Sequence, residues 1–236
     1  TTATGITRNN TPVKFCSVEI WDCCRFFSPT DISRTHNGDN VCTLADKRCF
    51  LSAVARVSQN LAIDDSPEIV SGLLNIPEVD RLEVQELRLC QQSSLWDMEY
   101  IRLGAMIQKS VHLAGLCLEI PLVDVPQAFF DSLANSIQIQ HLSLRCPKSK
   151  IYNRNQRQTM LSNLVVGEHS PGVVERLLQN SQSQLTVLHL HSMDIEDDHL
   201  IAIAQLLPTS RVEEIDFSWC CVQSKGLLEF ARQLPK

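Results

Sequence analysis

Two histidines, His189 and His191, are the residues whose type and spacing could most readily do chemistry. They are separated by one residue in the apolar stretch "LTVLHLHSMDI", and on an extended chain alternate side chains point to the same side. Asp216 takes the equivalent place in a later stretch of the same pattern, so it should lie about 5 Å from His189 on the neighbouring strand. Two imidazoles and a carboxylate could hold a metal ion. We favour the alternative that they are exposed polar groups available to a partner, and we expect no metal site.

Cysteine is the second residue type that could do chemistry. Cys90 and Cys117 are expected at outward-facing places of adjacent strands, where an exposed thiol near a histidine could act as a nucleophile. The sequence pairs neither thiol with a base, and it contains no P-loop, dinucleotide-binding, H-E-x-x-H or G-x-S-x-G motif. We therefore expect no catalytic residue, no cofactor and no enzymatic activity.

The ten cysteines of the chain are an even number that could form disulfides. However, Cys90, Cys117, Cys146 and Cys220 lie within or beside apolar segments, where a free thiol packs as a small hydrophobic group. No C-x-x-C pair provides a metal-binding spacing. We expect mostly buried, reduced thiols and a cytoplasmic protein, or one secreted into a host cytosol if it is a bacterial effector.

The stretch that carries the two histidines repeats along the chain. Its apolar residues follow the frame L-x-x-L-x-L-x-x-(N/C)-x-L, and copies begin at residues 84, 113, 139, 161, 185 and 212. Successive starts are 29, 26, 22, 24 and 27 residues apart. The copy that starts at residue 161 is weaker, and further copies begin at Phe15 and, in degenerate form, at Ser58. Periods of roughly 20 to 29 residues are typical of leucine-rich repeats.

A helix is expected after most copies of the frame. Some of these segments have apolar residues at helical spacing, and others begin with a residue that often starts a helix. The segments are residues 97–108, 126–137, 171–181, 196–207 and 224–234. In the last of these, Leu227, Leu228, Ala231 and Leu234 share one face, which should pack inward. One strand, turn and helix cannot bury the fourth- and sixth-place leucines alone, so the units must stack with their strands in parallel.

The rhythm of strand and helix resembles the ribonuclease-inhibitor-like class of leucine-rich repeat proteins over Val84 to Lys236. The best matches are "LTVLHLHSMDIEDDHLIAIAQLL" and "VEEIDFSWCCVQSKGLLEFARQL", with Gly226 and Ala231 where that class has small residues. The ninth place is rarely Asn, the spacing is uneven, and the copies before Val84 are degenerate. The resemblance implies an α/β fold: a leucine-rich repeat solenoid with a curved parallel β-sheet inside and helices outside.

The first third of the chain is less regular. We expect residues 1–80 to form an N-terminal capping region with irregular repeats, and residues 81–236 to form the leucine-rich repeat domain. A separate small N-terminal domain is the alternative. Within this third the sequence predicts a strand unit over residues 15–27, an exposed loop over 28–40 and a helix over 43–59.

Composition excludes two classes of partner. The net charge of −6 argues against a nucleic-acid binder that works through a basic face. No run of about 18 apolar residues is present, so we expect no membrane partner. Aromatic residues make up only 6% of the chain, and Leu, Ile and Val should fill the core.

The fifth, seventh and eighth places of the frame should gather on the concave face of the sheet. The fifth places include Val165, and the eighth include Gln91, Ile120 and Cys146. A surface with both charge signs suits one specific protein partner. The residues expected to bind that partner are Arg88, Glu119, Arg145, His189, His191, Asp216 and Trp219.

The function expected from this surface is that of a protein–protein interaction module, monomeric on its own, which serves as a regulator, an adaptor or a bacterial effector. The resemblance also allows a GTPase-activating or other enzyme-regulating protein, or the substrate-recognition part of a ubiquitin ligase.

Overall fold

A computed structural model describes residues 15–21, 58–64, 67–75, 83–91, 94–122, 124–146, 154–165, 171–193 and 195–233. For residues 15–21, 58, 67–69, 154, 157 and 158 it describes the backbone alone. Within these ranges seven strands form one sheet, and every strand pairs in parallel with the next strand along the chain. The strands are β1 (Phe15–Trp21), β2 (Ser58–Asp64), β3 (Glu86–Cys90), β4 (Gly115–Glu119), β5 (His141–Arg145), β6 (Val187–His191) and β7 (Glu214–Asp216).

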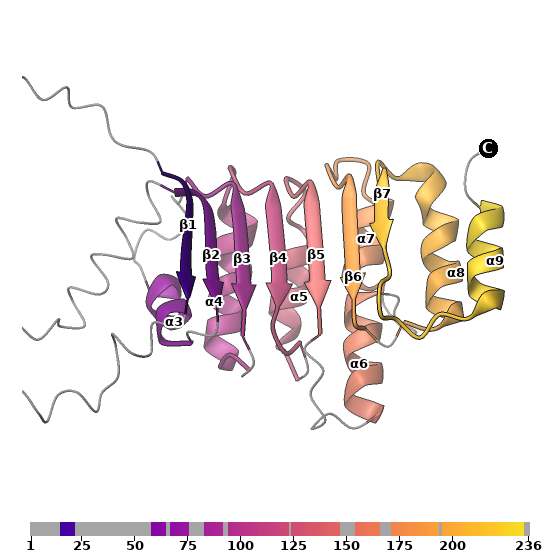
Figure 1. Ribbon diagram of the computed structural model, residues 1–236, viewed down its shortest axis with the longest axis horizontal. Helices are drawn as coiled ribbons and strands as arrows, with labels where there is room; N and C mark the ends of the chain where they lie inside the picture. Colours follow the sequence, from indigo (N-terminus) through magenta and orange to yellow (C-terminus); the bar gives the residue numbers. More distant parts are fainter. Residues whose placement is uncertain are drawn as a thin grey trace, which may run out of the picture.

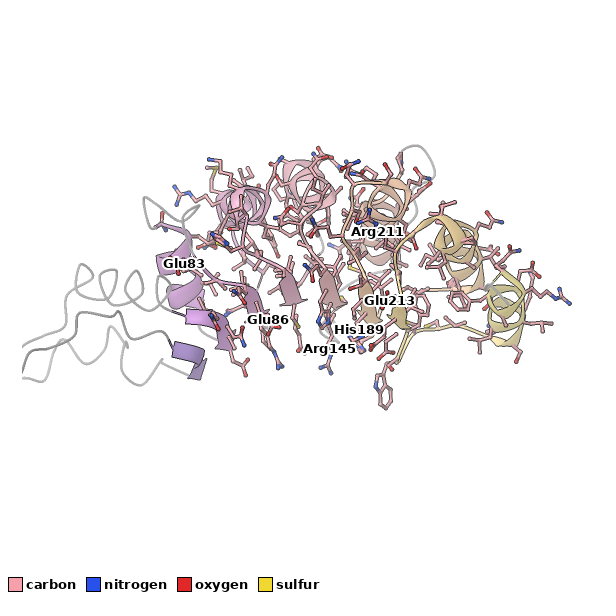
Figure 2. All side chains as sticks on the ribbon, turned by 90° about the horizontal axis from the view of Figure 1, so that it is seen from above. Glu83, Glu86, Arg145, His189, Arg211 and Glu213 are labelled. Atoms are coloured by element: carbon pink, nitrogen blue, oxygen red, sulfur yellow. The ribbon has the colours of Figure 1, made fainter. Side chains whose placement is uncertain are left out.

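Helices cover one face of this sheet (Figure 1). Seen from above, the strands form the inner layer and the helices the outer layer of a curved row (Figure 2). We call the sheet face opposite the helices the open face. The fold is therefore α/β, with a parallel sheet and a repeat-like order of strands and helices. The helices are α3 (Pro67–Leu74), α4 (Asp97–Lys109), α5 (Gln127–Ala134), α6 (Arg154–Leu164), α7 (Val173–Gln179), α8 (Asp197–Leu206), the 3₁₀ helix η3 (Leu207–Thr209) and α9 (Ser224–Gln233).

The strands are short because each uses only the alternating centre of the frame. Leu188 and Leu190 of β6 are fully buried, whereas Val187, His189 and His191 are partly exposed. Leucines at the same two places align across β3, β4, β5 and β6 in strand register. The fourth and sixth places therefore form two continuous apolar rows beneath the helices, as the frame predicts.

Helix α4 illustrates how the sequence positions the outer layer. Asp97 and Glu99 lie in its first turn and Lys109 in its last, which suits the helix dipole. The Glu99 carboxylate also accepts a hydrogen bond of 2.9 Å from the backbone N–H of Trp96. The buried face includes Tyr100, whose ring packs edge-on against Phe129 of α5 with ring centroids 5.6 Å apart. The predicted helices near residues 97–108, 126–137, 171–181, 196–207 and 224–234 are confirmed as α4, α5, α7, α8 and α9.

The weak copy of the frame at residue 161 is not a strand, and that prediction is wrong. Its first two apolar residues, Leu161 and Leu164, belong to α6, and β5 pairs directly with β6. A spacing of three residues suits a helical face as well as the start of the frame. Both leucines are buried, so the prediction that they belong to the core is correct, but they lie in a helix rather than a strand. The unit between β5 and β6 therefore contains two helices, α6 and α7.

The inward face predicted for the last helix is also wrong. Leu227 and Leu228 are more than half exposed, and Ala231 is exposed. Helix α9 approaches α8 through Gly226, where an added Cβ would come within 2.9 Å of the Cα of Asp197. Phe230 of α9 packs edge-on against Phe217, with ring centroids 5.8 Å apart, whereas Leu227 and Leu228 face solvent because no element within the described ranges lies beyond α9.

Two strands of the N-terminal third, β1 and β2, continue the same sheet. They correspond to the copies of the frame that begin at Phe15 and Ser58. The helix predicted over residues 43–59 is wrong at its end, because Ser58 and Gln59 belong to β2; its earlier part and the loop predicted over 28–40 lie outside the described residues. Helix α3 has no counterpart among the helices predicted from the sequence.

Candidate functional site

Mostly polar and charged residues line the open face in three rows that cross the strands. They occupy the third, fifth and seventh places of the frame, because these places alternate with the buried leucines. The third-place row is Asn60, Glu86, Gly115, His141, Val187 and Glu214. The fifth-place row is Ala62, Arg88, Cys117, Ser143, His189 and Asp216. The seventh-place row is Asp64, Cys90, Glu119, Arg145 and His191.

Three histidines meet on this face. The ring centroids of His141 and His189 are 5.1 Å apart, and those of His189 and His191 are 5.4 Å apart. Nε2 of His189 lies 3.0 Å from Oε1 of Glu214, and Nδ1 of His191 lies 3.8 Å from Oδ2 of Asp216. Asp216 is the register partner of His189, as the frame predicts, but the nearer carboxylate is that of Glu214.

A second polar pair links the neighbouring strands β4 and β5. Nε of Arg145 lies 3.3 Å from Oε1 of Glu119, and the two residues are register partners. Arg88 is exposed in the fifth-place row, where its register partners are Ala62 and Cys117. The structure therefore brings all the predicted site residues except Trp219 onto one face. Figure 2 shows Arg145 and His189 on the open side of the sheet together with Glu86.

Gly115 leaves a hollow in the middle of the third-place row. Its register neighbours Glu86 and His141 have long side chains, whereas Gly115 has none. A Cβ added at Gly115 would lie 2.9 Å from Cγ of Glu86, so even a methyl group would disturb the wall of the hollow. The hollow has a volume of about 340 Å³ and is also lined by Arg88, Cys117, Ser143 and His189.

Carboxylates outnumber guanidinium groups on the open face. The described rows contain two guanidinium groups, those of Arg88 and Arg145, and five carboxylates. With the histidines neutral, the net charge of the rows is therefore −3. The carboxylates are those of Asp64, Glu86, Glu119, Asp216 and Glu214.

Burial and hydrogen bonding shift the pKa values of two groups on this face. Burial, and then the nearby charge of His189, lower the pKa of His141 below its ordinary value, although Glu86 and Glu214 oppose the shift. Hydrogen bonds from Ser218, whose backbone N–H lies 2.7 Å from Oδ1 of Asp216, lower the pKa of that carboxyl. Asp216 is therefore charged over the whole neutral range.

The cysteine chemistry considered from the sequence is not favoured at Cys90. Burial, together with Asp64 and Glu119, raises the pKa of the Cys90 thiol to about 12, so almost none of it is thiolate near neutral pH. The five cysteines whose side chains are described are thiols rather than disulfides: Cys90, Cys117, Cys146, Cys220 and Cys221. Of these, Cys146 is buried, Cys90, Cys117 and Cys220 are partly exposed, and Cys221 is exposed, so the expectation of mostly buried thiols is met only in part.

The described side chains include no group of three or more His, Cys, Asp or Glu residues arranged to hold a metal ion. In the same part of the chain, no helix combines the length and the apolar character that a membrane span requires.

Trp219 lies beyond the end of β7, in a turn rather than in a row. Its side chain is 77% exposed, and its backbone has a φ of 63°, in the left-handed region that non-glycine residues rarely adopt. Ser192 holds the same eighth place in the preceding unit and has a φ of 53°. The left-handed turn is thus shared by the last two units.

Several other places expected on the concave face are buried. The frame assigns Val165 to a fifth place, but this residue follows α6 and is completely buried. The eighth places Gln91, Ile120 and Cys146 are also buried, because the chain turns toward the helices directly after each strand. The prediction that these residues line the concave face is wrong.

The residues predicted for the concave face do not include the third-place row, which contributes Glu86, His141 and Glu214. The signal was available, since side chains two residues apart share one face of a strand and the third place therefore belongs with the fifth and seventh. The diagonal contact between His189 and Glu214 could not be read from spacing, because it depends on side-chain rotamers.

The fold and this face together define a parallel α/β protein with a repeat-like order and a polar, acidic sheet surface. No protein-family model matches the sequence, and no curated protein matches it significantly.

Proposed function

We propose that the chain is a leucine-rich repeat solenoid of the ribonuclease-inhibitor-like class, and that it binds a partner protein through the open face. The observation that carries the proposal is the register of the strands, which aligns the third, fifth and seventh places of successive units into continuous rows. Residues far apart in sequence, such as Arg88 and Asp216, thereby share one surface.

The composition of the rows supports a protein ligand. Arginine, histidine and carboxylate side chains lie side by side, and several are already held by neighbours, such as Arg145 by Glu119. Side chains that are ordered before binding lose less entropy on association. A curved sheet of parallel strands also holds them on rigid elements rather than on loops.

The experiment compares capture of proteins from a lysate by the wild-type chain and by open-face variants. Arg145→Glu and the double variant His189→Ala/His191→Ala change exposed or partly exposed groups, so their melting temperatures should stay close to that of the wild type. We expect both variants to lose the proteins that the wild type captures. In a typical interface a few such residues each contribute about 2 kcal/mol or more to binding.

Lys109→Glu is the matched control for Arg145→Glu. Lys109 is exposed in the last turn of α4, in the outer layer, and its substitution makes the same change of charge. This variant should capture the same proteins as the wild type. If Lys109→Glu abolishes capture while the open-face variants bind normally, the helical side is the binding surface and the proposal is wrong.

A further inference from the structure

The hollow over Gly115 has an acidic wall that forms no ion pair with the described residues. Glu86 is exposed beside it and forms neither an ion pair nor a hydrogen bond through its carboxylate with the described part of the chain. The opposite wall is His141, whose lowered pKa keeps its imidazole neutral at pH 7. A cation that enters the hollow therefore meets a free carboxylate on one side and an uncharged ring on the other.

The floor and rim of the hollow suit a long side chain. Gly115 presents only backbone, Cys117 adds a small apolar surface, and the volume of about 340 Å³ leaves room for an extended stem of methylene groups. Lysine and arginine side chains combine such a stem with a terminal charge.

The charges farther along the open face also favour a positively charged ligand. Glu214 lies beyond His189 on one side of the hollow, and Asp64 lies on β2 on the other side. Arg145 already contacts Glu119, and this leaves Arg88 as the cation closest to the hollow. An excess of three negative charges over the three rows attracts basic segments and repels acidic ones.

From this arrangement we propose that the open face binds a basic segment of a partner protein, with one lysine or arginine side chain lying in the hollow over Gly115 against the carboxylate of Glu86. The inference rests on the proposed function and specifies the chemistry of the partner. Arg88 limits the affinity, because it places a positive charge near the bound side chain.

The direct test measures binding of an oligolysine peptide to the purified chain by fluorescence anisotropy at low salt, with an oligoglutamate peptide as the opposite probe. We expect oligolysine to bind and oligoglutamate not to bind. Binding should weaken at ~0.3 M salt, because exposed charges are screened. Preferential binding of oligoglutamate would overturn the proposal.

Three variants locate the peptide on the open face. Glu86→Gln should weaken oligolysine binding about two- to fivefold, the range expected for one exposed charge pair. Arg88→Gln removes the opposing charge and should strengthen binding by a similar factor. Gly115→Ala adds a methyl group at the floor of the hollow, 2.9 Å from Cγ of Glu86, without changing any charge, and should weaken binding as Glu86→Gln does.

Glu175→Gln, which removes one carboxylate from α7 on the outer layer, is the control and should change the affinity by less than about twofold. Equal losses in Glu86→Gln and Glu175→Gln would show attraction by net charge alone, and the proposed site would be wrong. Normal binding by Gly115→Ala, with an unchanged melting temperature, would rule out the hollow as the position of the side chain.

Failure of this inference differs from failure of the proposed function. If open-face variants lose their captured proteins but oligolysine does not compete with those proteins, the face binds a protein that is not basic. If oligolysine binds at Glu86 but the open-face variants capture proteins normally, the proposed function is wrong.

Discussion

Nε2 of His189 lies 3.0 Å from Oε1 of Glu214, although the residue opposite His189 in strand register is Asp216. The imidazole therefore reaches diagonally, toward the residue opposite Val187. His191 reaches in the same direction, toward Asp216 at 3.8 Å. Two parallel diagonal contacts thus connect β6 to the short edge strand β7 on the open face, while Leu188 and Ile215 connect the two strands on the other face.

Leu188→Ala should destabilise the fold strongly. Leu188 is fully buried, and truncating a buried leucine costs about 2–5 kcal/mol of unfolding free energy through lost transfer energy and the cavity that remains. Val187→Ala, on the opposite face of the same strand, should cost less than about 1 kcal/mol. Urea denaturation measures both values. Similar costs for the two variants would mean that the faces of β6 are assigned wrongly.

Trp219 allows a test of backbone strain. Its left-handed φ suits glycine but disfavours alanine as much as other residues, so Trp219→Gly should be more stable than Trp219→Ala by about 1 kcal/mol. In an ordinary strand or helix the order would be reversed. Thermal denaturation of the two variants decides the point, and a more stable alanine variant would contradict the turn geometry.

The Cys90 thiol should react slowly with iodoacetamide. The thiolate is the reactive form, and a pKa of about 12 leaves roughly one part in ten thousand ionised at pH 8. The exposed Cys221 provides an internal reference, because the two modified peptides can be followed by mass spectrometry in the same sample. Asp64→Asn removes one cause of the raised pKa and should speed the reaction at Cys90. Alkylation of Cys90 as fast as that of Cys221 would contradict the assigned environment.

His141 should make the fold less stable in mild acid. Its pKa is lower in the folded chain than the ordinary value of 6.5 that it regains on unfolding, so the unfolded state binds the proton more readily. The contribution to stability is present above pH 6.5 and is lost as the pH falls through the folded-state pKa.

The measurement for His141 is the unfolding free energy by urea denaturation between about pH 7 and 5, the window in which a histidine with a lowered pKa titrates. His141→Gln should reduce the loss of stability across this window. His112→Gln, at an exposed position in the turn between α4 and β4, is the control and should keep the wild-type dependence. An unchanged dependence in His141→Gln would show that another group is responsible.

The sequence predicted the positions of the strands better than the shape of the open face. Leu116 and Leu118, like Leu188 and Leu190, alternate at places that only a strand can bury together, so the frame located β4 and β6 correctly. It failed at Leu161, because three-residue spacing is shared by the frame and a helical face. On the open face the rows follow from periodicity, whereas the hollow depends on how the side chain of Glu86 lies beside a glycine, which no pattern of residue types specifies.

The pairing of every strand with its successor has a consequence for how the chain folds. Each pairing closes a loop of modest length, such as that from Glu86 to Gly115, so most contacts are local and the sheet can grow one unit at a time. The closure from His141 to Val187 is the longest among the described strands, because α6 and α7 both lie within it. A longer loop loses more chain entropy when it closes. Compared with the closure from Glu86 to Gly115, the closure from His141 to Val187 costs about 0.5 kcal/mol more in free energy. Among the described pairings, that of β5 with β6 therefore carries the largest loss of chain entropy, followed closely by that of β1 with β2.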